Sequence, residues 1–164
     1  MKKSTKFIAS AVAAVALFFS VNANAQSPKF GIGLNVGAGT SSGTNLAIGG
    51  DLRYQFDIDK QLSVPLTAGY TNIGVKNSDL SIAFVPVKAG LKYFFNDSGS
   101  GAYGLAEAGA GFAVGDNTGT SFVYSPAIGY SWSNGLDLAA KYEGYSNNGN
   151  IGYAGIRLAY GFKL

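Results

Sequence analysis

The charged side chains are the residues of this sequence that could do chemistry, because the chain contains no histidine and no cysteine. Without an imidazole, no side chain titrates near neutral pH in its ordinary state, so acid–base catalysis lacks its usual agent. A serine without a positioned base is a weak nucleophile, and Lys88 or Lys141 would have to supply that base. We therefore predict that the protein is not an enzyme and has no catalytic residues.

Metal and cofactor sites are not indicated by the sequence either. The lack of cysteine excludes disulfides and thiolate ligands, and the aspartates are scattered without the spacing of a calcium site. The glycine-rich run at 31–37 lacks the spacing and the following helix of a dinucleotide-binding fingerprint. We predict no metal and no cofactor.

The first 25 residues have the three parts of a secretory signal peptide. Three lysines within the first six residues precede an apolar run at 7–19, and the small residues at 23–25 resemble a signal-peptidase site. A membrane anchor would need about 20 apolar residues, and a lipoprotein would need a cysteine. We predict cleavage after residue 25, with Gln26 as the mature N-terminus and 26–164 as one domain.

Removing this segment leaves the chain electrically neutral. The whole sequence has 12 basic and 9 acidic residues, and three of the basic ones are lysines in the first 25 residues. Equal numbers of basic and acidic residues then remain. The basic character of the full chain therefore does not indicate a nucleic-acid partner.

The main structural signal is an alternation of apolar residues with small or polar ones, in eight segments. These span 30–39, 46–56, 62–71, 83–93, 106–112, 121–132, 136–143 and 153–164. An alternation with period two is the pattern of a β-strand, and about ten residues let a tilted strand cross a bilayer. The 24 glycines agree, because each costs a helix about 1 kcal/mol.

The breaks between these segments have the composition of turns. Short breaks at 57–60, 96–101 and 133–135 alternate with looser ones at 40–44, 72–80, 115–120 and 146–150. Tight turns on one side and loops on the other are expected when consecutive strands run up and down. We predict an all-β fold, an eight-stranded antiparallel up-and-down transmembrane β-barrel.

The charges indicate which face of the strands meets lipid. The apolar face carries no Asp, Glu, Lys or Arg. A charge that faces lipid at the bilayer midplane costs about 2–4 kcal/mol, so we expect the apolar face to be the outer one. The opposite face carries nine charged residues, which are Asp51, Arg53, Lys88, Lys92, Glu107, Asp137, Lys141, Glu143 and Arg157.

Aromatic residues are predicted to form a girdle near each end of the strands, with aliphatic residues between them. Amphipathic rings prefer the membrane interfaces, whereas a soluble barrel with an aromatic core would not sort its aromatic residues by height. The girdle on the side of the N-terminus contains Phe30, Tyr54, Phe56, Tyr93, Tyr130, Trp132, Tyr160 and Phe162. The other girdle contains Tyr70, Phe112, Phe122, Tyr124 and Tyr142, together with Phe84, for which the facing is left open.

These features resemble the OmpA/OmpX-like family of small outer-membrane β-barrel proteins, over the whole chain after the signal peptide. The last eight residues are similar to the C-terminal signal read by the barrel-insertion machinery, with Tyr160, Phe162 and Leu164 as its main residues. They depart from it in having Ala159 where glycine is usual, and Leu164 where many relatives end in phenylalanine. The segment 84–95 is also similar to a strand common in such proteins.

The resemblance implies a location and a set of partners. It implies the outer membrane of a Gram-negative cell, reached through the general secretory route, with outer-membrane lipids around a monomeric barrel. Periplasmic chaperones and the barrel-insertion machinery would act during biogenesis. The enzymes among small outer-membrane barrels rely on a histidine, which this chain lacks.

The inward charges allow two interpretations. As a structural network they pair with one another and fill the lumen, and glycines of the first and fifth segments leave room for them. As a conduit they line a path for small solutes, which is the alternative function; surface binding through the loops is a third hypothesis. Five of the nine charges are basic and four are acidic, a near balance that favours pairing and hence a structural or envelope role.

Two details of the interior are also predicted. The turn between the fourth and fifth segments centres near Asp97 and Ser98, which places Lys88 opposite Glu107 as a close partner. Tyr145 and Tyr153 point inward near the outer rim, where they either pack or stack on a ligand.

Overall fold

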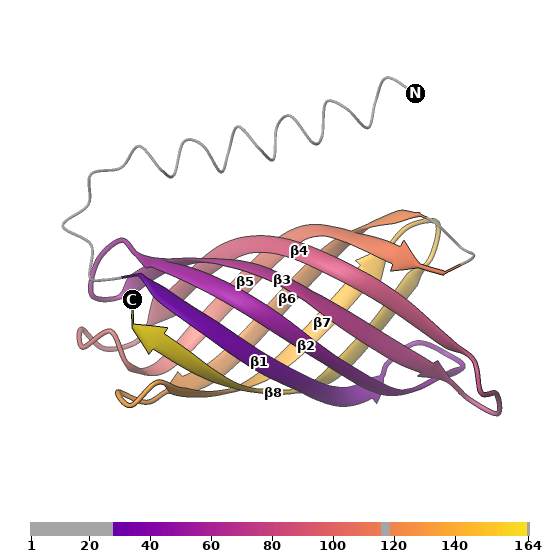
Figure 1. Ribbon diagram of the computed structural model, residues 1–164, viewed down its shortest axis with the longest axis horizontal. Helices are drawn as coiled ribbons and strands as arrows, with labels where there is room; N and C mark the ends of the chain where they lie inside the picture. The colour runs from indigo at the N-terminus through magenta and orange to yellow at the C-terminus, as the bar shows by residue number, and fades with distance from the viewer. Residues whose placement is uncertain (1–27, 116–118, 164) are drawn as a thin grey trace, which may run out of the picture.

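The computed structural model describes residues 28–115 and 119–163, and these form a closed barrel of eight antiparallel strands (Figure 1). Neighbours in sequence pair with each other, and β1 also pairs with β8, so the sheet has no free edge. The predicted up-and-down barrel is therefore confirmed. The strands are β1 (Lys29–Gly39), β2 (Thr44–Asp57), β3 (Leu62–Val75), β4 (Ser81–Phe94), β5 (Gly101–Val114), β6 (Thr120–Ser131), β7 (Leu136–Ser146) and β8 (Asn150–Lys163).

The two ends of the barrel differ in their connections. Lys29 of β1 pairs with Lys163 of β8, so both described ends of the chain lie at one end of the barrel, which we call the terminal end (Figure 1). The turns at 58–61, 95–100 and 132–135 lie there too. The opposite end, the loop end, carries the connections at 40–43, 76–80 and 147–149 and the one between β5 and β6. None of the described residues belongs to a helix long and apolar enough to cross a bilayer.

The strands extend further at the loop end than the sequence indicated. Residues 72–75 were expected in a loop but belong to β3, which leaves 76–80 as the connection. Ile73 explains the difference, because it is fully buried and continues the pairing of β3 with β4. The chain then reverses where Asn77 adopts a positive φ of 57°, a conformation that asparagine tolerates better than most residues.

A hydrogen-bonded aspartate shapes the turn at 58–61. The Asp59 carboxylate accepts hydrogen bonds from the backbone N–H groups of Gln61 and Leu62, both at 2.7 Å. Because these bonds favour the charged form, they lower the pKa of Asp59. The Asp59 carboxylate is therefore ionised throughout the neutral pH range and keeps these two hydrogen bonds in the turn.

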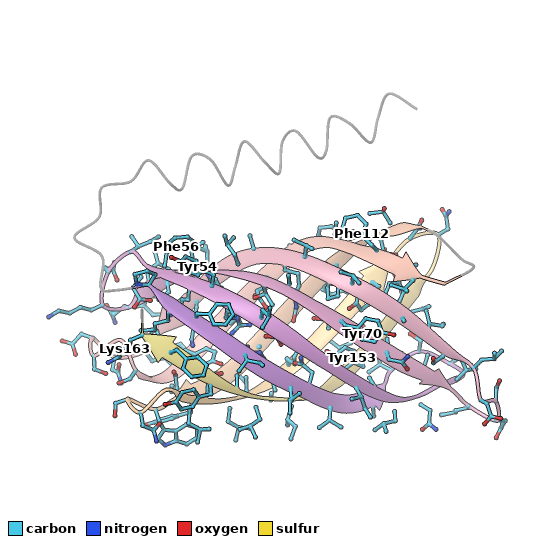
Figure 2. All side chains as sticks on the ribbon, in the orientation of Figure 1. Tyr54, Phe56, Tyr70, Phe112, Tyr153 and Lys163 are labelled. Atoms are coloured by element: carbon cyan, nitrogen blue, oxygen red, sulfur yellow. The ribbon has the colours of Figure 1, made fainter. Side chains whose placement is uncertain are left out.

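The outer surface is apolar, as predicted. Leu34 in the middle of β1 is 69% exposed, and Ile128 on β6 is 61% exposed. A continuous apolar surface of this extent marks contact with another apolar phase. Figure 2 shows Tyr54 and Phe56 near the terminal end, and Phe112 toward the loop end. The surface therefore has an aliphatic belt with aromatic rings toward both ends.

Phe84 corrects the predicted girdle at the loop end. It was counted in that girdle with the direction of its side chain left open, and in the structure the side chain points into the barrel and is 4% exposed. The alternation explains this, because Phe84 has the same parity on β4 as the inward residues Lys88 and Lys92. The position of Phe84 in the alternation along β4 decided which way its side chain points, and the apolar character of the ring did not.

A pair of substitutions tests whether the exposed belt faces lipid. Leu34→Arg should lower the free energy of unfolding by about 2–4 kcal/mol, because it places a charge in the middle of the belt. Leu80 is similarly exposed, at 71%, but it lies in the loop between β3 and β4. Leu80→Arg should therefore change stability by less than about 0.5 kcal/mol. Denaturant unfolding in lipid vesicles measures both values, and equal losses would contradict a lipid-facing belt.

Candidate functional site in the barrel interior

The nine charged residues predicted for the interior all lie inside the barrel. Each is at most 9% exposed to solvent. A buried charge is unfavourable unless it is paired and hydrogen-bonded, so the partners of these residues decide what the interior can do. They are Asp51 and Arg53 on β2, Lys88 and Lys92 on β4, Glu107 on β5, Asp137, Lys141 and Glu143 on β7, and Arg157 on β8.

Glu143 is the carboxylate with the most partners. Its Oε2 atom forms ion pairs with the ammonium groups of Lys88 and Lys141, at 2.9 Å from Lys141 Nζ. Its Oε1 atom accepts hydrogen bonds from three hydroxyl groups, at 2.7, 3.2 and 3.3 Å. These belong to Tyr145, Thr71 and Tyr153. Both carboxylate oxygens of this buried group are therefore satisfied.

Glu107 forms a second centre that shares Lys88 with the first. Its Oε2 atom lies 3.2 Å from Arg53 Nη2 and 3.6 Å from Lys88 Nζ. Its Oε1 atom accepts a hydrogen bond from the Thr67 hydroxyl at 2.5 Å, and that hydroxyl accepts one from Arg53 Nε. One lysine thus joins two carboxylates from different strands.

The predicted closeness of Lys88 and Glu107 is confirmed, but the predicted register was wrong. The pairing of β4 with β5 is displaced by two residues, so that Glu107 faces Gly90. The displacement arises in the turn at 95–100, where Gly99 adopts a positive φ of 67°. A shift of two residues keeps both side chains on the inner face, which is why they still meet.

Asp51 and Arg157 form a bidentate pair. Arg157 Nη2 lies 2.6 Å from Oδ1 of Asp51, and Nε lies 3.0 Å from Oδ2. Two parallel bonds of this kind are stronger and more directional than a single contact. Gly33 makes the space, because a Cβ atom there would lie 2.7 Å from Arg157 Nη2.

Asp137 completes the network toward the terminal end. It accepts hydrogen bonds from Lys92 at 2.9 Å and from the Tyr103 hydroxyl at 2.7 Å, and Arg157 Nη1 lies 3.5 Å away. The Lys92 ammonium also lies 3.8 Å from the centre of the Tyr103 ring, a cation–π arrangement.

Asn35 joins these centres into one network. Its amide nitrogen donates to Asp51 at 2.8 Å, and its amide oxygen accepts from Lys141 at 3.4 Å. All nine charged residues are thereby linked through direct contacts. Such a network can hold the strands together, and each buried carboxylate in it is matched by at least one cation.

An aromatic layer covers the network at the loop end. The rings of Phe84 and Tyr145 stack with their centres 4.1 Å apart. Tyr145 and Tyr153 are 2% and 1% exposed, so these two tyrosines pack in the interior. Buried with them in one apolar cluster are Ala47, Ile73 and Val123.

Two of the spaces within the described barrel bear on what the interior can bind. One is a cavity of about 10 Å³ beside the buried Ser125, whose Oγ has no hydrogen-bond partner among the described residues. About 10–15 Å³ is the least that holds one water molecule. The other, which we call the vestibule, has a volume of about 430 Å³ and opens at the terminal end.

In the described part of the chain, no three His, Cys, Asp or Glu residues lie close enough to one another to bind a metal ion. The carboxylates of the network are instead separated by cations.

Comparison with solved structures shows what kind of fold this is. The N-terminal β-barrel domain of Pseudomonas aeruginosa OprF has a TM-score of 0.61 and 17% identity, covering 85% of this chain and 100% of that one. Ail, the attachment invasion locus protein of Yersinia pestis, has a TM-score of 0.60 and 18% identity, covering 84% and 99%. The chain has the fold of small outer-membrane β-barrel proteins.

A third solved structure extends the likeness. Neisserial surface protein A has a TM-score of 0.52 and 13% identity, covering 85% of this chain and 99% of that one. No protein-family model matches the chain, and no curated protein sequence matches it. At these identities the likeness shows the fold, and function has to be argued from the residues.

Several residues of the network were not among the predicted site residues. Asn35 and Thr67 lie on the inner face by alternation, so their parity was an available signal. Tyr103 precedes the fifth predicted segment, which began at 106, five residues after the start of β5 at Gly101. The ion pair of Lys29 with Asp57, at 2.8 Å, was missed because Asp57 was assigned to a turn.

The residues predicted to form a C-terminal insertion signal are described in part. Tyr160 and Phe162 face outward on β8, with their ring centres 4.9 Å apart, as the alternation predicts. Leu164, the predicted signal peptide at 1–25 and the predicted mature N-terminus at Gln26 lie outside the described residues.

Proposed function

We propose that this protein is a non-enzymatic integral outer-membrane protein with a structural or envelope role and a lumen filled by side chains. The observation that carries the proposal is the continuous network of nine buried charges, covered at the loop end by the aromatic layer. Eight strands enclose an interior that is just wide enough for side chains to fill. Here the long side chains come from five strands and cross that interior.

The exposed belt and the fold support the outer-membrane location. We propose in addition that residues 1–25 direct export and are removed, that the C-terminal residues are read during insertion, and that the barrel is a monomer. The terminal end would then face the periplasm. Non-enzymatic action is supported by the lack of histidine and by the pairing of each buried carboxylate with cations.

Conductance measurements test the filled lumen against solute transport. Purified protein in planar bilayers should give no uniform, long-lived conductance steps, and liposomes that contain it should not swell in small sugars. A porin in the same lipid serves as positive control, because about sixteen strands leave an open channel. Reproducible steps that change when Arg157 or Lys141 is replaced would refute the proposal and favour transport.

A further inference from the structure

The wall of the vestibule at the terminal end contains several cationic side chains. Arg53, Lys92 and Arg157 line it from the network, and Lys29 and Lys163 line it at the ends of β1 and β8. Asp137 is the one acidic residue among its lining residues. Lys163 marks this end of the barrel in Figure 2.

Most of the carboxylates that pair with these cations do not line this space. Asp137, which contacts Lys92 and Arg157, is the exception, whereas Asp57, which holds Lys29, lies outside the wall. Asp51 holds Arg157 and Glu107 holds Arg53, and both acids lie outside the vestibule wall. The charged side chains of the vestibule wall are therefore five cations and one carboxylate. Further donors come from uncharged side chains of the wall, which include Gln55, Ser98, Ser131 and Asn134.

The vestibule is closed on its inner side. The ion-pair network separates it from the aromatic layer around Tyr145 and Phe84, which are 2% and 4% exposed. Tyr153 of that layer lies toward the loop end in Figure 2, away from Lys163. A ligand would therefore enter and leave through the terminal end only.

We propose that the vestibule binds small organic anions through their carboxylate or phosphate groups. Its volume of about 430 Å³ lies within the range of about 300–1,000 Å³ typical of small-molecule sites. Arginine and lysine are the side chains that recognise such groups, through charge-assisted hydrogen bonds. Anion binding at this end does not depend on the proposed function. The assignment of the periplasm as the compartment that supplies the anion does rest on it.

Calorimetric titration of the purified protein tests the proposal, first in micelles of an uncharged detergent. The probes are citrate and inorganic phosphate, with sorbitol as an uncharged control. Citrate should bind saturably and sorbitol should not, and added salt should weaken citrate binding. Absence of saturable citrate binding at low salt would overturn the proposal.

Two lysines at the mouth allow a matched comparison. The double variant Lys29→Gln/Lys163→Gln should weaken citrate binding about fivefold to tenfold, the combined effect of two partly exposed charges. Lys60→Gln removes an exposed lysine from the same end that does not line the vestibule, and it should leave binding unchanged. Equal losses of citrate affinity in the double variant and in Lys60→Gln would indicate that citrate is attracted to the charged surface in general, and would overturn the proposal.

Folding and the source of the anion are controlled separately. Resistance of the folded barrel to SDS should match the wild type, and Asp57 keeps its hydrogen bonds from Gln55 and Ser63 when Lys29 is replaced. The single variant Lys163→Gln serves if the double variant does not fold. In nanodiscs, citrate binding is compared between phosphatidylglycerol and phosphatidylcholine at a salt concentration that screens the surface charge of the lipid. Weaker binding with phosphatidylglycerol then identifies a lipid headgroup as competitor, and equal binding identifies free anions. Both results support the site, and neither depends on whether the barrel conducts.

Discussion

Replacing Glu143 by glutamine should lower the free energy of unfolding by about 3–5 kcal/mol, the usual loss when one partner of a buried ion pair is removed. The substitution keeps the shape of the side chain but removes the charge that compensates Lys88 and Lys141. It also replaces one of the two accepting carboxylate oxygens by an amide N–H₂ group, which cannot accept a hydrogen bond. No rearrangement within the filled interior restores the lost charge.

The measurement is denaturant unfolding of the barrel in lipid vesicles, with Asp79→Asn as the control. Asp79 is exposed in the loop between β3 and β4, so its loss should be below about 0.5 kcal/mol. Adding Lys88→Met to Glu143→Gln should cost less than the sum of the two single changes, because the orphaned cation is removed. Additive losses would show that the two side chains are not coupled.

Gly33→Val should be nearly as harmful, with an expected loss of about 3–5 kcal/mol. A Cβ atom at this position meets the guanidinium group of Arg157 at 2.7 Å. That group is the flexible end of a side chain, but both of its bonds to Asp51 hold it in place. Moving it separates a buried pair, and this separation, more than the steric contact, accounts for the loss.

Gly31 provides a matched control on the same strand and the same face. A Cβ atom at Gly31 would meet its nearest neighbour, the Tyr160 backbone oxygen, at an ordinary 3.5 Å. This glycine also borders the vestibule, so a larger side chain has space. Gly31→Val should cost less than about 1 kcal/mol, measured in the same unfolding experiment. Equal losses of stability at Gly33 and Gly31 would mean that valine acts through the strand backbone. They would contradict the conclusion that Gly33 leaves space for the Arg157 side chain.

The alternation was sufficient to predict eight strands, their faces and the membrane. Successive side chains on a strand point to opposite faces whatever the rest of the protein does, and a charge is expensive on a lipid face. These are local rules, and they placed Arg53, Glu143 and the other seven charges correctly inside. The same rule also places Phe84 inside, where its apolar character had suggested the outer girdle.

The partners of those charges could not be derived from alternation. Lys88 pairs with Glu143, which is 55 residues away in sequence and comes from β7. Which side chains meet across the lumen depends on the stagger of the strands and on barrel closure. A turn that shifts register by two residues changes every facing pair without changing any facing direction, and this is how Glu107 came to face Gly90.

The sequence alone determined that charged residues fill the interior and that apolar residues cover the exterior, because each depends only on the parity of a residue along its strand. The tertiary structure decided that the charges form one network, that Phe84 and Tyr145 close the loop end, and that a basic vestibule opens at the other. These features bring together residues from strands that are not adjacent in the sheet. Their distances are set by the closure of the barrel and by the space that glycines such as Gly33 leave for long side chains.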